Sequence, residues 1–304
     1  MQKITKDNIL KVRSYLLDLQ ENIISMINTY DKREFLRDEW ARKEGGGGIT
    51  CVLQNGDTFD KVGVNFSDIL GDHLPVAATN LRPELQGKSY QAMGVSVVCH
   101  PTNPHLPTSH LNVRLFTAYD EDSEPIWWFG GGFDMTPYYG YEEDAIHWHK
   151  TARDLCLPYG KEIYDTYKNN CDEYFYIKHR GEARGIGGIF FDDLNVWDFN
   201  TCFEFIKSVG NGFIKAYEPI VKKRINKSYT EQQKDFQLFR RGRYAEFNLV
   251  YDRGTLFGLQ SNGRTESILM SMPPLVKWSY KYNIEKNSEE EKLYKFFLVP
   301  KKWI

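Results

Sequence analysis

A helical pattern opens the chain. Residues 7–38 carry apolar side chains at steps of three and four positions, with charged side chains between them. This spacing places the apolar positions on one face of an α-helix, so we predict a helix over residues 7–38. Four glycines at positions 45–48 end the pattern.

Beyond these glycines the apolar positions alternate in steps of two, which is typical of strands. Asn55-Gly56 separates two such runs and indicates a tight hairpin. The acidic segment 120–125 predicts a turn between two antiparallel strands. The strands that the alternation predicts are residues 49–53, 59–66, 92–99, 110–118, 126–133, 187–191, 244–250 and 267–272.

Helical patterns return in blocks, at residues 141–155, 161–174 and 199–222, with a shorter helix near residue 240 after a charged loop. Strands that neighbour one another in hairpins, with helices in separate blocks, favour an α+β fold with a sizeable antiparallel sheet over alternating βαβ units. No repeat, linker or change of composition divides the chain. We therefore expect a single domain over residues 1–304.

The composition narrows the class of protein. Hydrophobic residues make up 41% and aromatic residues 15% of the chain, which argues against extensive disorder. The net charge of -2 gives no general attraction to nucleic acid or to an anionic membrane. No apolar run approaches the ~20 residues that span a bilayer, and the first residues lack an apolar signal region. The five cysteines are scattered without a CxxC pair, so we expect reduced thiols and a cytoplasmic protein.

The histidines are concentrated in one loop. Three of the seven, His100, His105 and His110, lie in a run stiffened by three prolines, and this run leads into the strand that carries Asn112 and Arg114. Histidine is the side chain whose ordinary pKa lies nearest neutrality. The run therefore predicts a site with titratable groups beside an anion-binding cation.

Arginines and glycines point to a small anionic ligand. Guanidinium groups bind carboxylates bidentately, and on a slightly negative chain a set of them suggests a polyanionic small molecule rather than DNA. Surface ion pairing is the alternative for about half of these arginines. Glycines 130–132 lie among aromatic residues, which fits either a planar ligand or core packing. The arginines are Arg114, Arg180, Arg184, Arg240, Arg241, Arg243, Arg253 and Arg264.

Two carboxylate positions add to this picture. Asp252 follows the apolar run 247–250 and precedes Arg253, whose charge would favour an ionised carboxylate that acts as a base or as a counter-charge. Asp192 and Asp193 have a similar place after a strand, although one of the two is expected simply to cap a turn.

Several long stretches resemble the oxygen-dependent coproporphyrinogen III oxidases. The most specific is residues 181–193, which read GEARGIGGIFFDD, and the resembling stretches cover residues 45–68, 94–116, 127–155, 159–195 and 240–274. The resemblance implies a large, about seven-stranded antiparallel sheet flanked by helices on both faces. It also implies oxidative decarboxylation of two propionates of coproporphyrinogen III to vinyl groups, giving protoporphyrinogen IX, CO2 and H2O2 in haem biosynthesis. O2 is the implied co-substrate, with no organic cofactor, and the implied assembly is a homodimer with residues 244–279 in the interface.

The same resemblance assigns roles to individual residues. His110 corresponds to the proton donor, and the implied substrate contacts are Ser96, Asn112, Val113, Arg114, Asn262, Gly263 and Arg264. Where the family pattern has a glycine pair, this chain has Asn262-Gly263, so the backbone contact there is the less secure one. A divalent metal such as Mn2+ is implied at His100, His110, His149 and His179. We add Arg253 to the substrate contacts and Asp252 to the catalytic residues because of their place in the sequence.

These residues suggest a mechanism. Removing a pyrrole N–H proton makes an electron-rich carbon that can react with O2, with Asp252 accepting or supporting that proton and His110 acting as an acid or base at the peroxide stage. Two alternatives remain open from the residues alone. One is a non-haem iron oxygenase with two histidines and a carboxylate, and the other is a porphyrin-binding carrier without catalysis.

Overall fold

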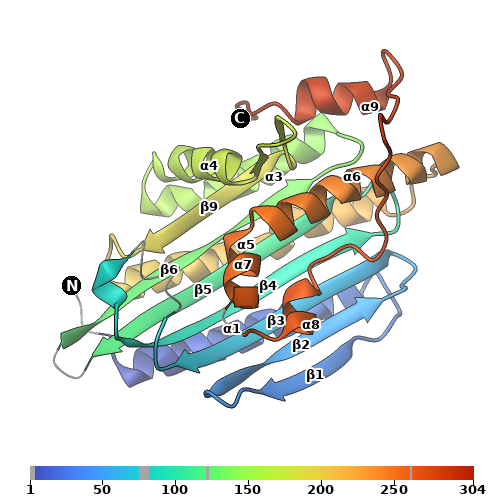
Figure 1. The fold of residues 1–304 in the computed structure, drawn as a ribbon. Coiled ribbons are helices and arrows are strands. Elements are labelled where there is room, and N and C mark those ends of the chain that lie inside the picture. The colour runs from blue at the N-terminus through green and yellow to red at the C-terminus, as the bar shows by residue number, and fades with distance from the viewer. Residues whose placement is uncertain (1–3, 75–81, 121–122, 261) are drawn as a thin grey trace.

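The fold is built on a seven-stranded antiparallel sheet with the order β1-β2-β3-β4-β5-β6-β9 (Figure 1). It was obtained as a computed structural model that describes residues 4–74, 82–120, 123–260 and 262–304. Strands β1 to β6 pair in chain order, and β9 joins β6 at the end of the sheet. The strands of the sheet are β1 (Leu36–Ala41), β2 (Gly46–Gln54), β3 (Phe59–Gly71), β4 (Ser89–Pro101), β5 (Thr108–Asp120), β6 (Ser123–Thr136) and β9 (Gly187–Leu194). A separate small hairpin pairs β7 (Tyr176–Ile177) with β8 (Glu182–Ala183).

Helices lie on both faces of this sheet (Figure 1). On one face α1 and α5 pack against the central strands, and α3 packs on α5. On the other face α6, α7 and α8 cross in front of the strands, and α4 packs beside β9 (Figure 1). The longer helices are α1 (Lys6–Asn28), α3 (Glu142–Cys156), α4 (Ile163–Tyr174), α5 (Phe199–Arg224) and α6 (Glu231–Val250). The shorter ones are α7 (Arg253–Gln260), α8 (Thr265–Leu269) and α9 (Glu289–Lys292), with single turns at Pro83–Leu85, Leu157–Tyr159 and Leu293–Phe297.

Strand β5 shows how the sequence gives the two faces different characters. Leu111, Val113 and Leu115 are buried in the hydrophobic core that α1 and α5 complete. Because side chains alternate along a strand, the intervening His110, Asn112 and Arg114 point to the opposite face, where they are only partly buried. Apolar residues thus fix one face of the sheet, and polar residues remain available on the other.

The predicted fold class, an α+β fold with a large antiparallel sheet flanked by helices, is confirmed. Six predicted strands correspond to β2 to β6 and β9, and the Asn-Gly hairpin is present with Asn55 at φ 56°. The strands on either side of the acidic turn pair antiparallel as expected, although residues 121 and 122 of that turn lie outside the described residues. Helices predicted at 141–155, 161–174 and 199–222 correspond to α3, α4 and α5.

Three predictions of secondary structure were wrong. The first helix ends at Asn28, and residues of the predicted helix beyond it form the edge strand β1. The cause lies at Asp31, whose carboxylate accepts the backbone N–H groups of Arg33, Thr58 and Phe59 and so ties the chain to the β2–β3 hairpin. This contact comes from residues distant in the sequence, which a local pattern cannot reveal.

The other two errors lie near the C-terminal end. Residues 244–250 are the last turns of α6 rather than a strand, and 267–272 contains the end of α8. A capping box at Thr230 and Gln233 starts α6 much earlier than the predicted short helix. From there Phe236, Phe239 and Phe247 are buried at helical spacing, so one long helix includes both the predicted short helix near residue 240 and residues 244–250.

Candidate active site

A group of polar side chains covers the face of the sheet that lies under α6 to α8. We call Ser96, His110, Asn112, Arg114 and Asp192 the sheet floor. Ser96 and Asn112 are paired across β4 and β5, and Arg114 lies opposite Gly130 of β6. The exposed fractions are 21% for His110, 35% for Arg114 and 27% for Asp192, so these side chains are reachable from outside while being held from below.

His110 is oriented by a buried ion pair. Its Nδ1 lies 2.8 Å from Oδ1 of Asp134, the residue opposite it on β6. Both oxygens of Asp134 also accept hydrogen bonds from Nη2 of Arg184, at 2.8 and 2.7 Å. Asp134 and Arg184 are almost completely buried, so the histidine is the member of this triad that reaches the floor.

The charge of Asp134 determines which ring nitrogen of His110 donates a hydrogen bond to it. Burial alone would raise the pKa of Asp134, but the positive charge of Arg184 and the hydrogen bond with His110 lower it below its ordinary value. An ionised carboxylate only accepts hydrogen bonds, so Nδ1 of His110 carries a proton. Among the described residues Nε2 of His110 has no hydrogen-bond partner. In the neutral imidazole Nε2 is therefore the nitrogen that can accept a hydrogen bond.

Aromatic rings enclose the guanidinium of Arg184. Its Cζ lies 4.0 Å from the ring centre of Phe175, 4.6 Å from that of Tyr244 and 4.7 Å from that of Phe247. Nη1 of Arg184 donates to Oδ1 of Asn248 at 2.8 Å. Strand β6, the β8 region and helix α6 thus meet at one buried charge.

Asp252 begins α7 instead of ending a strand. Its Oδ2 accepts the backbone N–H and the hydroxyl of Thr255, both at 2.8 Å, which is the geometry of a helix N-cap. Its Oδ1 accepts a hydrogen bond from Tyr174 at 2.9 Å. The negative charge of Asp252 contributes to raising the pKa of Arg184 and of Tyr244. Its contribution is smaller than those of burial and of Asp134. The carboxylate predicted to be catalytic is therefore held fixed beside the His110 triad.

The predicted substrate-binding arginines lie at two separate places around the floor. Arg114 and Arg253 meet at Asp192, with N–O distances of 2.8 and 3.4 Å. Arg264 bonds Asp38 of β1 at 2.6 Å and the hydroxyl of Ser267 at 3.1 Å, and Ser267 in turn contacts Thr50 of β2. Strands β2 and β5 are three pairing steps apart, roughly 14 Å at the usual strand spacing. The cations therefore lie at two places on this face of the sheet, several strands apart.

The other predicted substrate contacts are Val113 on β5 and Asn262 and Gly263 after α7. The Val113 side chain lies in the core on the other face of the sheet, so only its backbone could approach a ligand on the floor. Asn262 has φ 55° and the N–H of Gly263 donates to the carbonyl of Gly258, so these two residues close the end of α7. They lead directly into Arg264.

The four histidines of the implied metal site are separated by their own hydrogen bonds. His100 is fully buried and contacts Thr108 and the carbonyl of Ser271, and burial lowers its pKa well below the ordinary value. His149 contacts Tyr164 and the carbonyl of Ile186, and burial lowers its pKa to about 3. His179 contacts Tyr251 and Glu246 near the surface.

Both ring nitrogens of these three histidines are occupied in this way, and His110 lies apart in its own triad. Within the described ranges no three His, Cys, Asp or Glu side chains are grouped closely enough to hold a metal ion. The donor set implied for Mn2+ or a similar ion does not fit a shared site within the described part of one chain.

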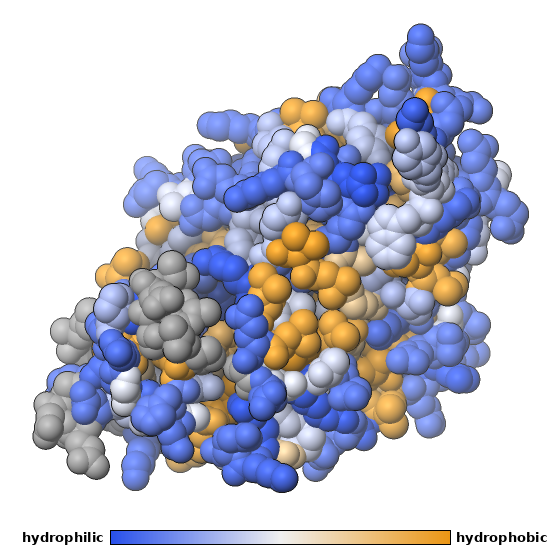
Figure 2. All heavy atoms as spheres, in the orientation of Figure 1, coloured by the Kyte–Doolittle hydropathy of each residue, from blue (hydrophilic) through white to orange (hydrophobic). Residues whose placement is uncertain are grey.

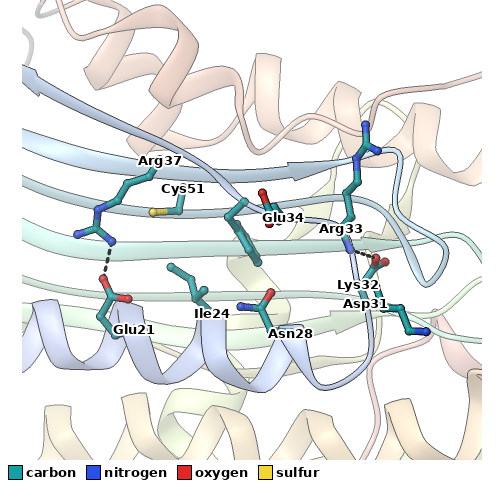
Figure 3. Close-up of a pocket in the computed structure, with 10 residues that line it drawn as sticks. Glu21, Ile24, Asn28, Asp31, Lys32, Arg33, Glu34, Arg37 and Cys51 are labelled. Atoms are coloured by element: carbon teal, nitrogen blue, oxygen red, sulfur yellow. Dashed lines mark hydrogen bonds and ion pairs between the residues drawn. The ribbon is translucent and has the colours of Figure 1, made fainter.

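A groove of about 440 Å³ lies elsewhere, between α1 and the β1 edge of the sheet (Figure 3). Glu21 and Arg37 form a 2.6 Å ion pair across it, and Cys51 lies at its side. None of the predicted site residues lines this groove. It is a different feature from the sheet floor.

Asp134 was missed from the sequence as a site residue, and Arg184 was recognised only as one of several arginines. The signal was present, because Asp134 interrupts an apolar strand between Phe133 and Met135. A carboxylate at such a position is rarely buried unless it is paired. The sequence could therefore have indicated a buried cation partner, but not which of the arginines supplies it.

The fold and this site define an α+β protein whose sheet carries, on one face, a histidine bound to a buried aspartate–arginine pair and three arginines that are each paired with an aspartate. A sequence model of the coproporphyrinogen III oxidase family matches residues 11–303, nearly the whole chain. The chain belongs to the coproporphyrinogen III oxidase family.

Membership of this family establishes the activity. The chain is an oxidoreductase that carries out the oxidative decarboxylation of coproporphyrinogen III in haem biosynthesis. Neither alternative, the non-haem iron oxygenase or the non-catalytic porphyrin carrier, is supported by the family match. None of the helices in the described part of the chain is long and apolar enough to cross a membrane.

Proposed function

We propose that coproporphyrinogen III lies flat on the sheet floor, with propionates bound by Arg114 and Arg253 at one side and by Arg264 at the other. The observation that carries this proposal is that His110 shares one face of the sheet with these cations, while its Nε2 has no hydrogen-bond partner among the described residues. Ser96 and Asn112, between the two sides, supply hydrogen-bonding groups. Asn262, Gly263 and the backbone of Val113 are proposed as lesser contacts.

In this proposal O2 is the oxidant and no organic cofactor takes part. For each propionate the balance is one carboxylate, one O2 and one proton in, and one vinyl group, one CO2 and one H2O2 out. The C–C bond to the carboxylate breaks, its electron pair forms the vinyl double bond, and the departing hydride equivalent reduces O2. An electron-rich pyrrole can supply this reactivity once its N–H proton is removed.

The residues of this chain have separate tasks in such a reaction. His110, held by Asp134, moves a proton at the peroxide stage. Asp252 has both oxygens hydrogen-bonded already, which favours a role as a fixed negative charge that supports the pyrrole proton over a role as its final acceptor. The aromatic side chains around Arg184, with Phe190 and Tyr174 beside Arg253, shield the reacting centre from water.

The experiment uses anaerobically prepared coproporphyrinogen III and enzyme stripped of metal by a chelator. On admission of O2 we expect one CO2 released per O2 consumed until two propionates have reacted. O2 uptake and CO2 release are measured together. Activity restored only by added iron would point to an iron oxygenase, and binding without turnover would point to a carrier; either result contradicts the proposal.

We propose that two copies of the chain form a homodimer through residues 244–279. Large apolar side chains are exposed in and next to this segment, and Figure 2 shows hydrophobic residues gathered at the centre of the face on which it lies. Apolar patches exposed to water commonly mark contacts with another protein. The side chains, with exposed fractions from 40% to 93%, are Leu249, Val250, Leu259, Leu275, Trp278 and Tyr280.

Replacing Leu249 and Leu275 together with glutamate is expected to convert the dimer to a monomer, because charged side chains in the interface would lose their hydration. Light scattering coupled to size-exclusion chromatography measures the mass. Leu157→Glu is the matched control, since Leu157 is 54% exposed but lies outside the segment. A wild-type chain that is monomeric, or a double variant that stays dimeric, would refute this interface.

All five cysteines are free and buried. Burial raises the pKa of Cys99 and of Cys156 to about 12, so these thiols are unreactive. This supports the proposal that the protein works in a reducing compartment such as the cytoplasm.

A further inference from the structure

One carboxylate of the chain lies where two of the proposed substrate arginines converge. Oδ1 of Asp192 is 2.8 Å from Nη2 of Arg114, and Oδ2 is 3.4 Å from Nη2 of Arg253. Arg114 comes from β5 and Arg253 from the start of α7, so Asp192 joins the floor to the helix that covers it. Each oxygen serves one arginine, as the two oxygens of a bound propionate would.

The backbone is shaped to bring Asp192 to this place. The pairing of β6 with β9 shifts register between Phe129 and Gly131, so that Asp192 and Asp193 both fall opposite Gly130. Asp193 adopts φ 58° and pairs outward with Arg82, while Asp192 turns onto the floor. Bulges of this kind are common beside active sites because they re-aim a side chain.

Gly130 makes room for this ion pair. A Cβ added there would lie 2.8 Å from Oδ1 of Asp192 and 2.9 Å from Nη2 of Arg114. The absence of a side chain at Gly130 thus lets a carboxylate and a guanidinium meet above β6.

The other side of the floor repeats the arrangement. Arg264, proposed to bind a different propionate, is already paired with the carboxylate of Asp38 at 2.6 Å. All three proposed substrate arginines therefore have an aspartate of the same chain as partner. Ordinary ion pairing at a surface would not require that each of the three proposed substrate arginines be paired with an aspartate.

We propose that Asp192 is an internal counter-ion that a substrate propionate displaces: its carboxylate holds Arg114 and Arg253 together until the carboxylate of the substrate takes its place. The inference rests on the proposed function of the sheet floor. Both arginines are substantially exposed, at 35% and 60%, and ion pairs in contact with water are weak because water screens them. Replacing the carboxylate of Asp192 with that of a substrate propionate thus changes the free energy little. Asp192 lowers the affinity of the site for carboxylates and at the same time keeps the two arginines in place.

The test is the affinity for coproporphyrin III, the stable oxidised tetracarboxylate, measured by fluorescence titration of the full-length protein. Asp192→Asn is expected to lower the Kd by roughly threefold to tenfold, because the competing charge and its repulsion of the propionate are removed. Asp193→Asn is the matched control, with the same loss of charge one residue away at an exposed position where asparagine tolerates positive φ. Its Kd should equal that of the wild type.

A double-variant cycle tests the displacement itself. In an Arg114→Gln background the effect of the Asp192→Asn change on Kd should be smaller, since one of the two cations that Asp192 shares with the propionate is gone. Thermal unfolding of each variant shows whether the fold is kept. An unchanged or raised Kd in a folded Asp192→Asn protein overturns the counter-ion role, as does an undiminished effect in the Arg114→Gln background.

Different results would refute the proposed function of the sheet floor and the counter-ion role of Asp192. If the wild-type chain neither binds coproporphyrin III nor decarboxylates coproporphyrinogen III, the proposed function of the floor is wrong. If the wild type does both and only the Asp192→Asn result is absent, the site stands and the counter-ion inference alone is refuted.

Discussion

Replacing His110 with glutamine should lower the turnover of coproporphyrinogen III by about 10²- to 10⁴-fold, the usual contribution of a positioned general acid or base. Glutamine keeps a hydrogen-bonding side chain opposite Asp134 but has no nitrogen that can exchange a proton near neutral pH. The arginines around the floor are untouched, so the Kd for coproporphyrin III should change little. CO2 release measures turnover, and fluorescence titration measures binding.

His147→Gln is the control for this experiment. His147 lies on α3, half-buried, and contacts the carbonyl of Ala216 far from the floor, a contact that the amide of glutamine can reproduce. Its turnover should remain within a few-fold of the wild type. Near-normal turnover of His110→Gln, with substrate bound as before, would remove His110 from the mechanism.

Replacing Arg184 with methionine should lower the free energy of unfolding by about 3–5 kcal/mol, because the ionised carboxylate of Asp134 is then buried without its cation. Both partners are only 2% exposed, so water cannot compensate. Urea unfolding measures the change. The orientation of His110 depends on the same carboxylate, so turnover should fall as well.

Two further variants make this prediction specific. Arg180→Met breaks another arginine–carboxylate pair, with Glu246, but Arg180 is 38% exposed, and a loss of about 0–1 kcal/mol is expected. Arg184→Met combined with Asp134→Asn should recover part of the stability, since no uncompensated charge remains. If the double variant is no more stable than Arg184→Met alone, the buried charge is not the cause of the loss.

The sequence predicts best what local periodicity controls. Alternation along β5 correctly separates the core residues from the polar face, and the Asn-Gly signal correctly places the β2–β3 hairpin. The same alternation fails at residues 244–250, because a helix that is buried on several sides shows no clear polar stripe over a short window. Strand β1 was hidden because the contacts that end α1 come from Asp31 and residues of the next hairpin.

The candidate site also contains residues that the sequence indicates and residues that only the tertiary structure reveals. His110, Asn112 and Arg114 are recognisable because they follow one another on one face of a single strand. The partners that orient them, Asp134 and Arg184, come from other elements, and only tertiary structure selects this pair. The metal assignment shows the reverse case, since four histidines alike in the sequence are placed in four different hydrogen-bonded environments.

The ion pair between Arg184 and Asp134 joins parts of the chain that are far apart in the sequence. The sheet from β1 to β6 contains only residues up to 136, and it already includes His110 and Asp134. Arg184 follows about fifty residues later, and its second partner, Asn248, lies near the end of α6. The arginine that holds the carboxylate of Asp134 is thus distant in the sequence from the strands that carry His110 and Asp134. The hydrogen-bonded arrangement of His110, Asp134 and Arg184 is therefore complete only when segments distant in the sequence have packed against the sheet.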